Sequence, residues 1–180
     1  MGKAWKHFCT ITYHRYLVAK GCFHIGLFRQ GFLHDLSKYS PAEFLVGAKH
    51  FQGTRSPNDA EREEKGYSAA WLHHKGRNKH HYEYWMDYSK QAPPGVMVPV
   101  PMPDRYIAEM IMDRIAACKV YKGKSYTNRD AYQYFLKSSH VSTMHEYTKD
   151  KLGRMLAILA DEGEEALYRA VRQELLHKKK

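Results

Sequence analysis

Residues 34–44 read His-Asp-Leu-Ser-Lys-Tyr-Ser-Pro-Ala-Glu-Phe and join two apolar helical runs. The second run has a strong helix start, because Ser40 can cap it, Pro41 suits its first position and Glu43 completes a capping box. The stretch therefore predicts a helix, a short break and a new helix. This pattern places the boundary between two helices in the N-terminal half of the chain.

Within this stretch, His34 and Asp35 are adjacent near the end of the first run. Neighbouring side chains on a helix diverge by roughly 100°, so the two do not ordinarily face one partner. A metal ion near the helix end could still collect both side chains. Lys38 would then be placed to meet a phosphate bound to that metal, although a surface pair is the simpler interpretation of an isolated His-Asp.

Apolar spacing predicts helices on both sides of this stretch. On the first helix, His7, Ile11, His14 and Val18 fall on one stripe, and Gly21 is the expected stop. The predicted helices are 5–20, 23–36, 41–51, 59–75, 79–89, 104–122, 128–137, 142–160 and 163–177. Residues 91–103 hold five of the seven prolines and are expected to be irregular.

The pattern contains no internal repeat and no alternating strand signal. It predicts an all-α fold, a compact multi-helix bundle. We expect one domain over 1–180, with 123–180 as a C-terminal helical extension.

Composition narrows the class of partner. A formal net charge of +10 favours anionic partners such as nucleic acid or a small anionic substrate. No apolar run is long enough to span a bilayer and no secretory signal is evident, so no membrane partner is expected.

Three cysteines without a Cys-x-x-Cys spacing are typical of reduced thiols in a cytoplasmic protein. A homo-oligomer is compatible with the sequence, and Lys178–Lys180 are expected to form a solvated tail.

Two further polar residues interrupt apolar helices. His14 lies on the inward stripe of the first helix, where a histidine bonded to a carbonyl is the simplest interpretation. Asp113 sits in an apolar run and needs a compensating partner, either a neighbouring arginine or a metal ion.

A dense cluster lies at His73-His74-Lys75-Gly76-Arg77-Asn78-Lys79-His80-His81. It combines four histidines with three cations, which suggests a site for a metal or an anion. A solvated basic turn is the alternative. Imidazole and mixed His/Asp donors suit Mn, Fe, Co, Ni or Zn, as one or two ions.

The order histidine, His-Asp pair, aspartate in a helical chain resembles the HD-domain superfamily of metal-dependent phosphohydrolases. The resemblance covers roughly the first two-thirds of the chain. Ser37 stands where many members have glycine, and Lys38 matches their lysine. Carried over residue by residue, it implies metal ligation by His14, His34, Asp35 and Asp113.

Members with two metals often recruit further histidines between the pair and the last aspartate. The resemblance therefore adds His74 and His81 as possible ligands, and His73 and His80 as other candidates. It does not decide which histidine of each adjacent pair, His73 or His74 and His80 or His81, would bind the metal.

A closer resemblance rests on longer signatures. Residues 34–44, Ala70-Trp71-Leu72-His73-His74 and Asn78-Lys79-His80-His81-Tyr82-Glu83-Tyr84-Trp85 are similar to an uncharacterised bacterial and phage domain family. That likeness implies membership but no substrate.

The sequence favours a metal-dependent phosphohydrolase acting on a nucleotide or another small phosphorylated metabolite. Catalytic roles are assigned to Asp35, Lys38 and Glu43. Phosphate contacts are expected from Lys38, Arg77 and Lys79. Glu109, one turn before Asp113, and Asn78 are candidate supporting residues.

Two alternatives stay open. The first is an HD-fold di-iron oxygenase, because the same His and Asp ligands serve both chemistries. The second is a non-enzymatic helical protein that binds nucleic acid, which is ranked last because no DNA-binding motif is evident.

Overall fold

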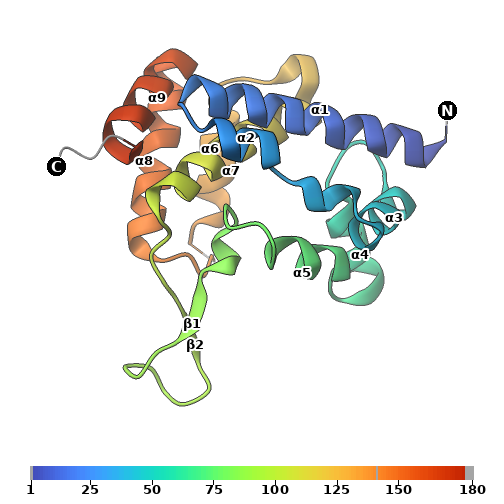
Figure 1. Ribbon diagram of the computed structural model, residues 1–180, viewed down its shortest axis with the longest axis horizontal. Coiled ribbons are helices and arrows are strands. Elements are labelled where there is room, and N and C mark those ends of the chain that lie inside the picture. Colours follow the sequence, from blue (N-terminus) through green and yellow to red (C-terminus); the bar gives the residue numbers. More distant parts are fainter. Residues whose placement is uncertain (1, 141, 177–180) are drawn as a thin grey trace.

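The computed structural model describes residues 2–140 and 142–176, and it confirms an all-α, compact multi-helix fold (Figure 1). The α-helices are α1 Lys3–His24, α2 Phe28–Leu33, α3 Pro41–His50, α4 Pro57–Lys65, α5 Ala69–Lys75, α6 Asp104–Lys122, α7 Asp130–Ser138, α8 Glu146–Glu162 and α9 Glu164–Val171. The short helical turns are η1 Leu36–Tyr39, η2 Tyr82–Tyr84, η3 Gly123–Ser125 and η4 Arg172–Leu176. None of the helices in the described ranges is both long and apolar enough to cross a bilayer.

Helix α6 is the centre of the fold. It packs against α1 and also against α8 and η4. One apolar core joins side chains of α1, α6, α7, α8 and α9. Its fully buried members include Ile107, Ile111, Leu152, Leu156 and Leu167.

The first helix is longer than predicted, because Gly21 does not end it. Gly21 is buried inside α1, and a Cβ atom there would lie 2.8 Å from the Met112 sulfur of α6. The glycine therefore serves the close approach of α1 to α6. The predicted helix 23–36 is correspondingly shortened to α2, while the stripe through His7, Ile11, His14 and Val18 is buried as predicted.

The predicted helix 59–75 is wrong, because two helices occupy these residues. Gly66 has a φ of +79°, a left-handed conformation that ends α4. The Ser68 side chain then accepts a hydrogen bond from Trp71 N and starts α5. This break turns the histidines at the end of α5 back toward α3.

The predicted helix 79–89 is also wrong. Residues 82–84 form only the turn η2, and Met86–Tyr88 form strand β1. Strand β1 pairs antiparallel with β2, Met97–Pro99, with Asp87 opposite Val98. This pairing holds Met86–Tyr88 in an extended conformation and so excludes a continuous helix, and the hairpin extends away from the helices (Figure 1).

The C-terminal helices are close to those predicted. His145 caps α8, which begins later than residue 142. Helix α9 ends at Val171 and passes into a π-helical turn, η4. The predicted end at His177 and the Lys178–Lys180 tail lie outside the described residues.

Candidate metal centre

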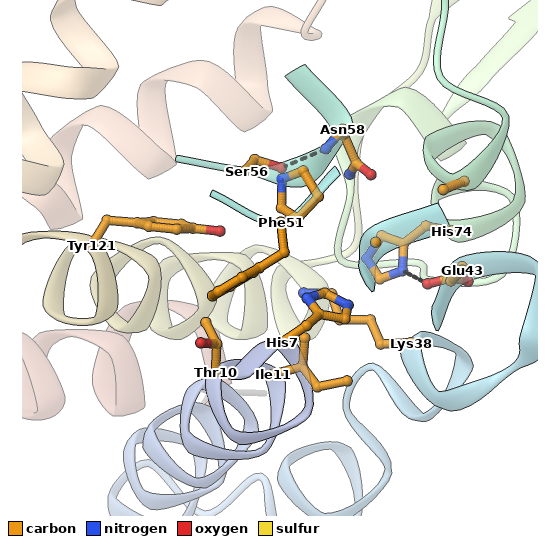
Figure 2. Close-up of a pocket in the computed structure, with 13 residues that line it drawn as sticks. His7, Thr10, Ile11, Lys38, Glu43, Phe51, Ser56, Asn58, His74 and Tyr121 are labelled. Atoms are coloured by element: carbon orange, nitrogen blue, oxygen red, sulfur yellow. Dashed lines mark hydrogen bonds and ion pairs between the residues drawn. The ribbon is translucent and has the colours of Figure 1, made fainter. Parts of the chain in front are cut away.

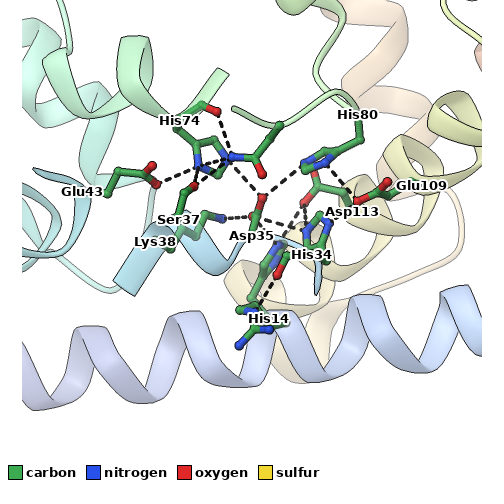
Figure 3. A network of polar contacts seen from close by, with 12 residues as sticks. His14, His34, Asp35, Ser37, Lys38, Glu43, His74, His80, Glu109 and Asp113 are labelled. Carbon is green, nitrogen blue, oxygen red and sulfur yellow. Dashed lines mark hydrogen bonds and ion pairs between the residues drawn. The ribbon is translucent and has the colours of Figure 1, made fainter. Parts of the chain in front are cut away.

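The histidine, the His-Asp pair and the later aspartate of the sequence pattern converge at one place (Figure 3). His14 comes from α1, Asp113 from α6, and His34 with Asp35 from the end of α2. One donor atom from each residue lies within 4.8 Å of the others. We call these four residues the His14 group. His14 and Asp113, the two polar residues in apolar helices, are each other's partners, with His14 Nε2 2.9 Å from Asp113 Oδ1.

The backbone at Asp35 explains how two adjacent side chains face the same point. Asp35 has φ 52° and ψ 30°, and it is the one non-glycine residue with positive φ in the described ranges. Asp tolerates this left-handed conformation better than most residues. Arg15 holds the same bend, because its side chain donates hydrogen bonds to the carbonyls of His34 (2.7 Å) and Phe32 (3.1 Å).

A second group of donors shares Asp35. It consists of Asp35, His74, His80 and His81, again with donor atoms within 4.8 Å, and we call it the His74 group. Asp35 Oδ1 lies 3.3 Å from His74 Nε2 and 3.4 Å from His80 Nε2. Its other oxygen, Oδ2, lies 3.3 Å from His34 Nε2. One carboxylate thus presents an oxygen to each group.

Two glutamates fix the orientation of the histidines. Glu109 Oε1 lies 2.9 Å from His34 Nδ1 and 3.1 Å from His80 Nδ1. Glu43 Oε2 lies 2.8 Å from His74 Nδ1. With each Nδ1 hydrogen directed to a carboxylate, Nε2 of the same ring is left to face Asp35. Carboxylates commonly position metal-ligating histidines in this way.

The donor atoms fit a bound cation. Within the described ranges, the buried atoms without a well-aligned hydrogen bond include six that face the two groups: His14 Nε2, His34 Nε2, His80 Nε2, His81 Nε2 and both oxygens of Asp35. Two of them still have a charged neighbour, because Asp113 lies beside His14 Nε2 and Lys38 beside Asp35 Oδ2. Buried polar atoms are rarely left without a hydrogen bond unless another partner is intended. A mixed set of imidazoles and carboxylates is the donor chemistry of divalent transition metals.

We call the His14 and His74 groups, together with Glu109 and Lys38, the polar centre. The charge on its carboxylates also favours a bound cation. Burial opposes ionisation of Asp35, but the positive charges of His34 and Lys38 outweigh it and hold the pKa of Asp35 well below its usual range. Burial also raises the pKa of Glu109, but hydrogen bonds from His34 and His80 outweigh this and lower it to about 2. Asp35 and Glu109 are therefore held ionised in the centre, the state in which a carboxylate binds a cation or orients a histidine ligand.

Lys38 connects this centre to a cavity. Its ammonium lies 2.7 Å from Asp35 Oδ2, and its side chain is 28 % exposed. The side chain of Lys38 also lines the cavity, where Figure 2 shows it beside His7 and Ile11. His74 lines the same cavity. Among the sequence candidates for phosphate binding, Lys38 alone reaches both places.

Other sequence candidates are placed elsewhere. Arg77 is exposed and donates to the carbonyl of His73, and Lys79 lies over the Tyr84 ring. Neither lines the cavity, so their phosphate contacts stay predictions without a supporting contact. His73 lies outside both groups, with Nδ1 2.6 Å from Glu43. Its neighbour His74 is the buried member of that pair.

Glu43 and Asn78 act on His74. The predicted capping box does not form, because the Ser40 side chain makes no cap hydrogen bond and Glu43 turns to the histidines instead. Asn78 donates to Ser37 Oγ at 2.9 Å and to the carbonyl of His74 at 2.8 Å. Glu43 reaches no donor of the His14 group in these contacts, so its position favours orienting His74.

Sequence reasoning missed two supporting residues. Arg15 follows His14 and holds the end of α2, while Gln30 Nε2 donates to Glu109 Oε2 at 2.9 Å. A single sequence gives no feature that distinguishes the helical faces carrying these two residues from ordinary exposed faces. The one available signal was their spacing from the ligands, Arg15 beside His14 and Gln30 one turn before His34.

Comparison with known families places the chain in one of them. The model of a family described as a family of unknown function (DUF5662) matches residues 3–158. Because this match spans most of the chain, the chain belongs to that family. No match was found to a curated protein or to a solved structure.

Proposed function

We propose that this member of the DUF5662 family is a metal-dependent phosphohydrolase that cleaves a small phosphate ester at a two-metal centre. Family membership prescribes no activity, so the proposal rests on the polar centre. The observation that carries it is the position of Asp35. Its two oxygens each face a separate histidine group, which suits a carboxylate shared by two ions.

The residues divide into ligands and supporting groups. One ion would be held by the His14 group and a second by the His74 group, with Asp35 common to both. Mn, Fe, Co, Ni and Zn all suit this donor set. When bound, such an ion supplies a Lewis acid for a phosphoryl oxygen and lowers the pKa of a water molecule.

The remaining side chains bind and orient. The Lys38 ammonium carries a charge that can hold a phosphoryl oxygen at the edge of the cavity. Burial lowers the pKa of Lys38, but the negative charges of Asp35 and Asp113 outweigh burial and raise it, so Lys38 stays protonated. Glu109 and Glu43 keep the imidazoles in the tautomer that presents Nε2 to the centre.

The first experiment is elemental analysis of protein purified without added metal and without a histidine tag. We expect near-stoichiometric transition metal in the wild type and its loss in Asp35→Asn. The matched control is Asp150→Asn, because Asp150 is exposed on α8. Metal-loaded protein would then be assayed with p-nitrophenyl phosphate and a panel of phosphate monoesters. Protein that binds none of the five metals would refute the proposal.

An HD-fold di-iron oxygenase is the second candidate. The observation that favours it is the histidine-rich donor set of both groups, which iron also accepts. Iron as the sole tightly bound metal, oxygen uptake on reduction and no release of phosphate would favour this candidate. Release of phosphate with several divalent metals would favour the phosphohydrolase.

A further inference from the structure

The cavity beside the polar centre is lined by residues from several helices and from the segments that join them. His7 and Thr10 come from α1, Phe51 follows α3, Asn58 begins α4, and Tyr121 lies near the end of α6. Lys38 and His74 also line the cavity, and both belong to the polar centre. The cavity and the centre therefore adjoin each other at these two side chains.

We propose that this cavity binds the alcohol portion of a phosphate monoester and selects a sugar-sized polyhydroxy alcohol that carries one phosphoryl group. This inference rests on the proposed phosphohydrolase function. If Lys38 holds the phosphoryl oxygens beside Asp35, the alcohol of the ester is directed into the space between α1, α4 and α6. Lys38 thus sets the orientation of the bound ester, with its phosphoryl group at the polar centre and its alcohol in the cavity.

Charge supports a single phosphoryl group. Among the residues that line the cavity, Lys38 is the one lysine or arginine. Burial and the nearby charge of Lys38 lower the pKa of His7 to about 4, so His7 is neutral near pH 7. Arg77 and Lys79 do not line the cavity. A diphosphate or triphosphate would therefore place additional negative charge where the cavity offers no further cation.

The uncharged part of the lining supports a hydroxyl-bearing alcohol. His7 Nδ1 is buried and makes no hydrogen bond within the described ranges. The amide of Asn58 and the hydroxyl of Tyr121 offer further donors and acceptors. Figure 2 shows Tyr121 projecting from α6 toward Phe51, so an aromatic wall faces these polar groups. Ligand sites commonly combine apolar walls with a few such polar groups.

Size supports a small alcohol. The cavity has a volume of about 80 Å³. One water molecule needs ~10–15 Å³ by the same measure, so the space suits a group of several heavy atoms. A three- to five-carbon sugar fits this range better than a nucleoside or a nucleic acid strand.

The test uses metal-loaded full-length protein with ribose 5-phosphate, a nucleoside 5′-triphosphate and inorganic phosphate as probes. Asn58→Ala and Tyr121→Phe each remove hydrogen-bonding groups from the cavity, and Tyr67→Phe is the control because Tyr67 is exposed and lies outside it. We expect each cavity variant to raise KM for ribose 5-phosphate about five- to tenfold, the effect of one hydrogen bond. Inhibition by inorganic phosphate, metal content and kcat should stay within about twofold of the wild type.

The outcomes separate the two proposals. Hydrolysis of ribose 5-phosphate with an unchanged KM in both variants, or preference for the triphosphate, would overturn the cavity assignment and leave the phosphohydrolase intact. If no ester is hydrolysed, the proposed function fails, and calorimetry still tests the cavity. Ribose 5-phosphate should then bind more tightly than inorganic phosphate, and Asn58→Ala should remove the difference. Equal affinities would overturn the inference.

Discussion

On one side of α6, Ile107, Ile111 and Ile115 are buried in the apolar core that includes α8 and α9. On another side of the same helix, Glu109 and Asp113 are turned to the histidines of the polar centre. Among the described residues, the buried members of the apolar core carry no charged side chain, whereas the polar centre buries carboxylates and imidazoles together. A buried charge costs free energy unless it is paired.

This difference separates the residues that stabilise the fold from those of the candidate metal centre. Changes in the apolar core should alter stability and leave metal binding intact. Changes in the polar centre should alter metal binding more than they alter the fold. The following predictions test this division, from the largest effect to the smallest.

Leu156→Ala should destabilise the protein most. Leu156 is fully buried in α8, and truncating a buried leucine costs about 2–5 kcal/mol. Urea unfolding measures the loss, and elemental analysis below the unfolding transition should show unchanged metal content. Leu45→Ala, at an exposed site of α3, is the control with little effect. Loss of metal from folded Leu156→Ala protein would contradict the division between the apolar core and the polar centre.

Glu109→Gln should weaken metal binding about 10- to 100-fold while the fold persists. The reason is that Glu109 accepts from Nδ1 of both His34 and His80, and a glutamine cannot accept as strongly from the two rings. Competition with a chelator measures the affinity. Glu162→Gln, at an exposed position of α8, should leave it unchanged. Equal affinity in Glu109→Gln would show that the two rings need no such support.

His7→Gln should flatten the dependence of stability on pH. The folded-state pKa of His7, about 4, lies below the ordinary value of 6.5, so the unfolded chain binds the proton first as pH falls. Stability is therefore retained above pH 6.5 and lost between pH 6.5 and 4, by at most about 1.4 kcal/mol per pH unit. Urea unfolding at pH 7 and 5.5 gives this slope. Identical slopes for the wild type and the variant would contradict the prediction.

Glu63→Gln should have the smallest effect. The Arg55–Glu63 pair lies at the surface, where both side chains are substantially exposed, and such pairs contribute little. Thermal unfolding should give the same midpoint as the wild type within error. A clear loss of stability would mean that charge pairs outside the polar centre also matter to the fold.

The four residues of the His14 group were named together through the HD-superfamily resemblance, and the structure brings their donor atoms to one place. Local spacing contributed only part of this, because it placed His14 on the inward stripe of α1 and showed that Asp113 in the apolar run of α6 needs a partner. The choices between His73 and His74, and between His80 and His81, could not be made in this way. They depend on how Gly66 and Ser68 turn α5 toward α3 and on the path of the chain into η2.

The role of Glu43 shows the same limit. From sequence it was a capping residue, because it stands three residues after Ser40, or a catalytic group, because it follows residues 34–38 by one short turn. Its observed partners, His73 and His74, are 30 and 31 residues away. Likewise, Gly21 was expected to end a helix, since its contact with Met112 of α6 is invisible in the local sequence. Features set by long-range packing were the ones that sequence reasoning missed.

The left-handed backbone at Asp35 restricts which substitutions this position can accept. The bend favours glycine, asparagine or aspartate, and the two groups of histidines require a carboxylate between them. Only aspartate meets both demands, and a longer glutamate would satisfy the charge but strain the turn. A library that places all twenty residues at position 35 should therefore separate two phenotypes. Asparagine and glycine should give folded protein without metal, and β-branched residues should give protein that is poorly folded.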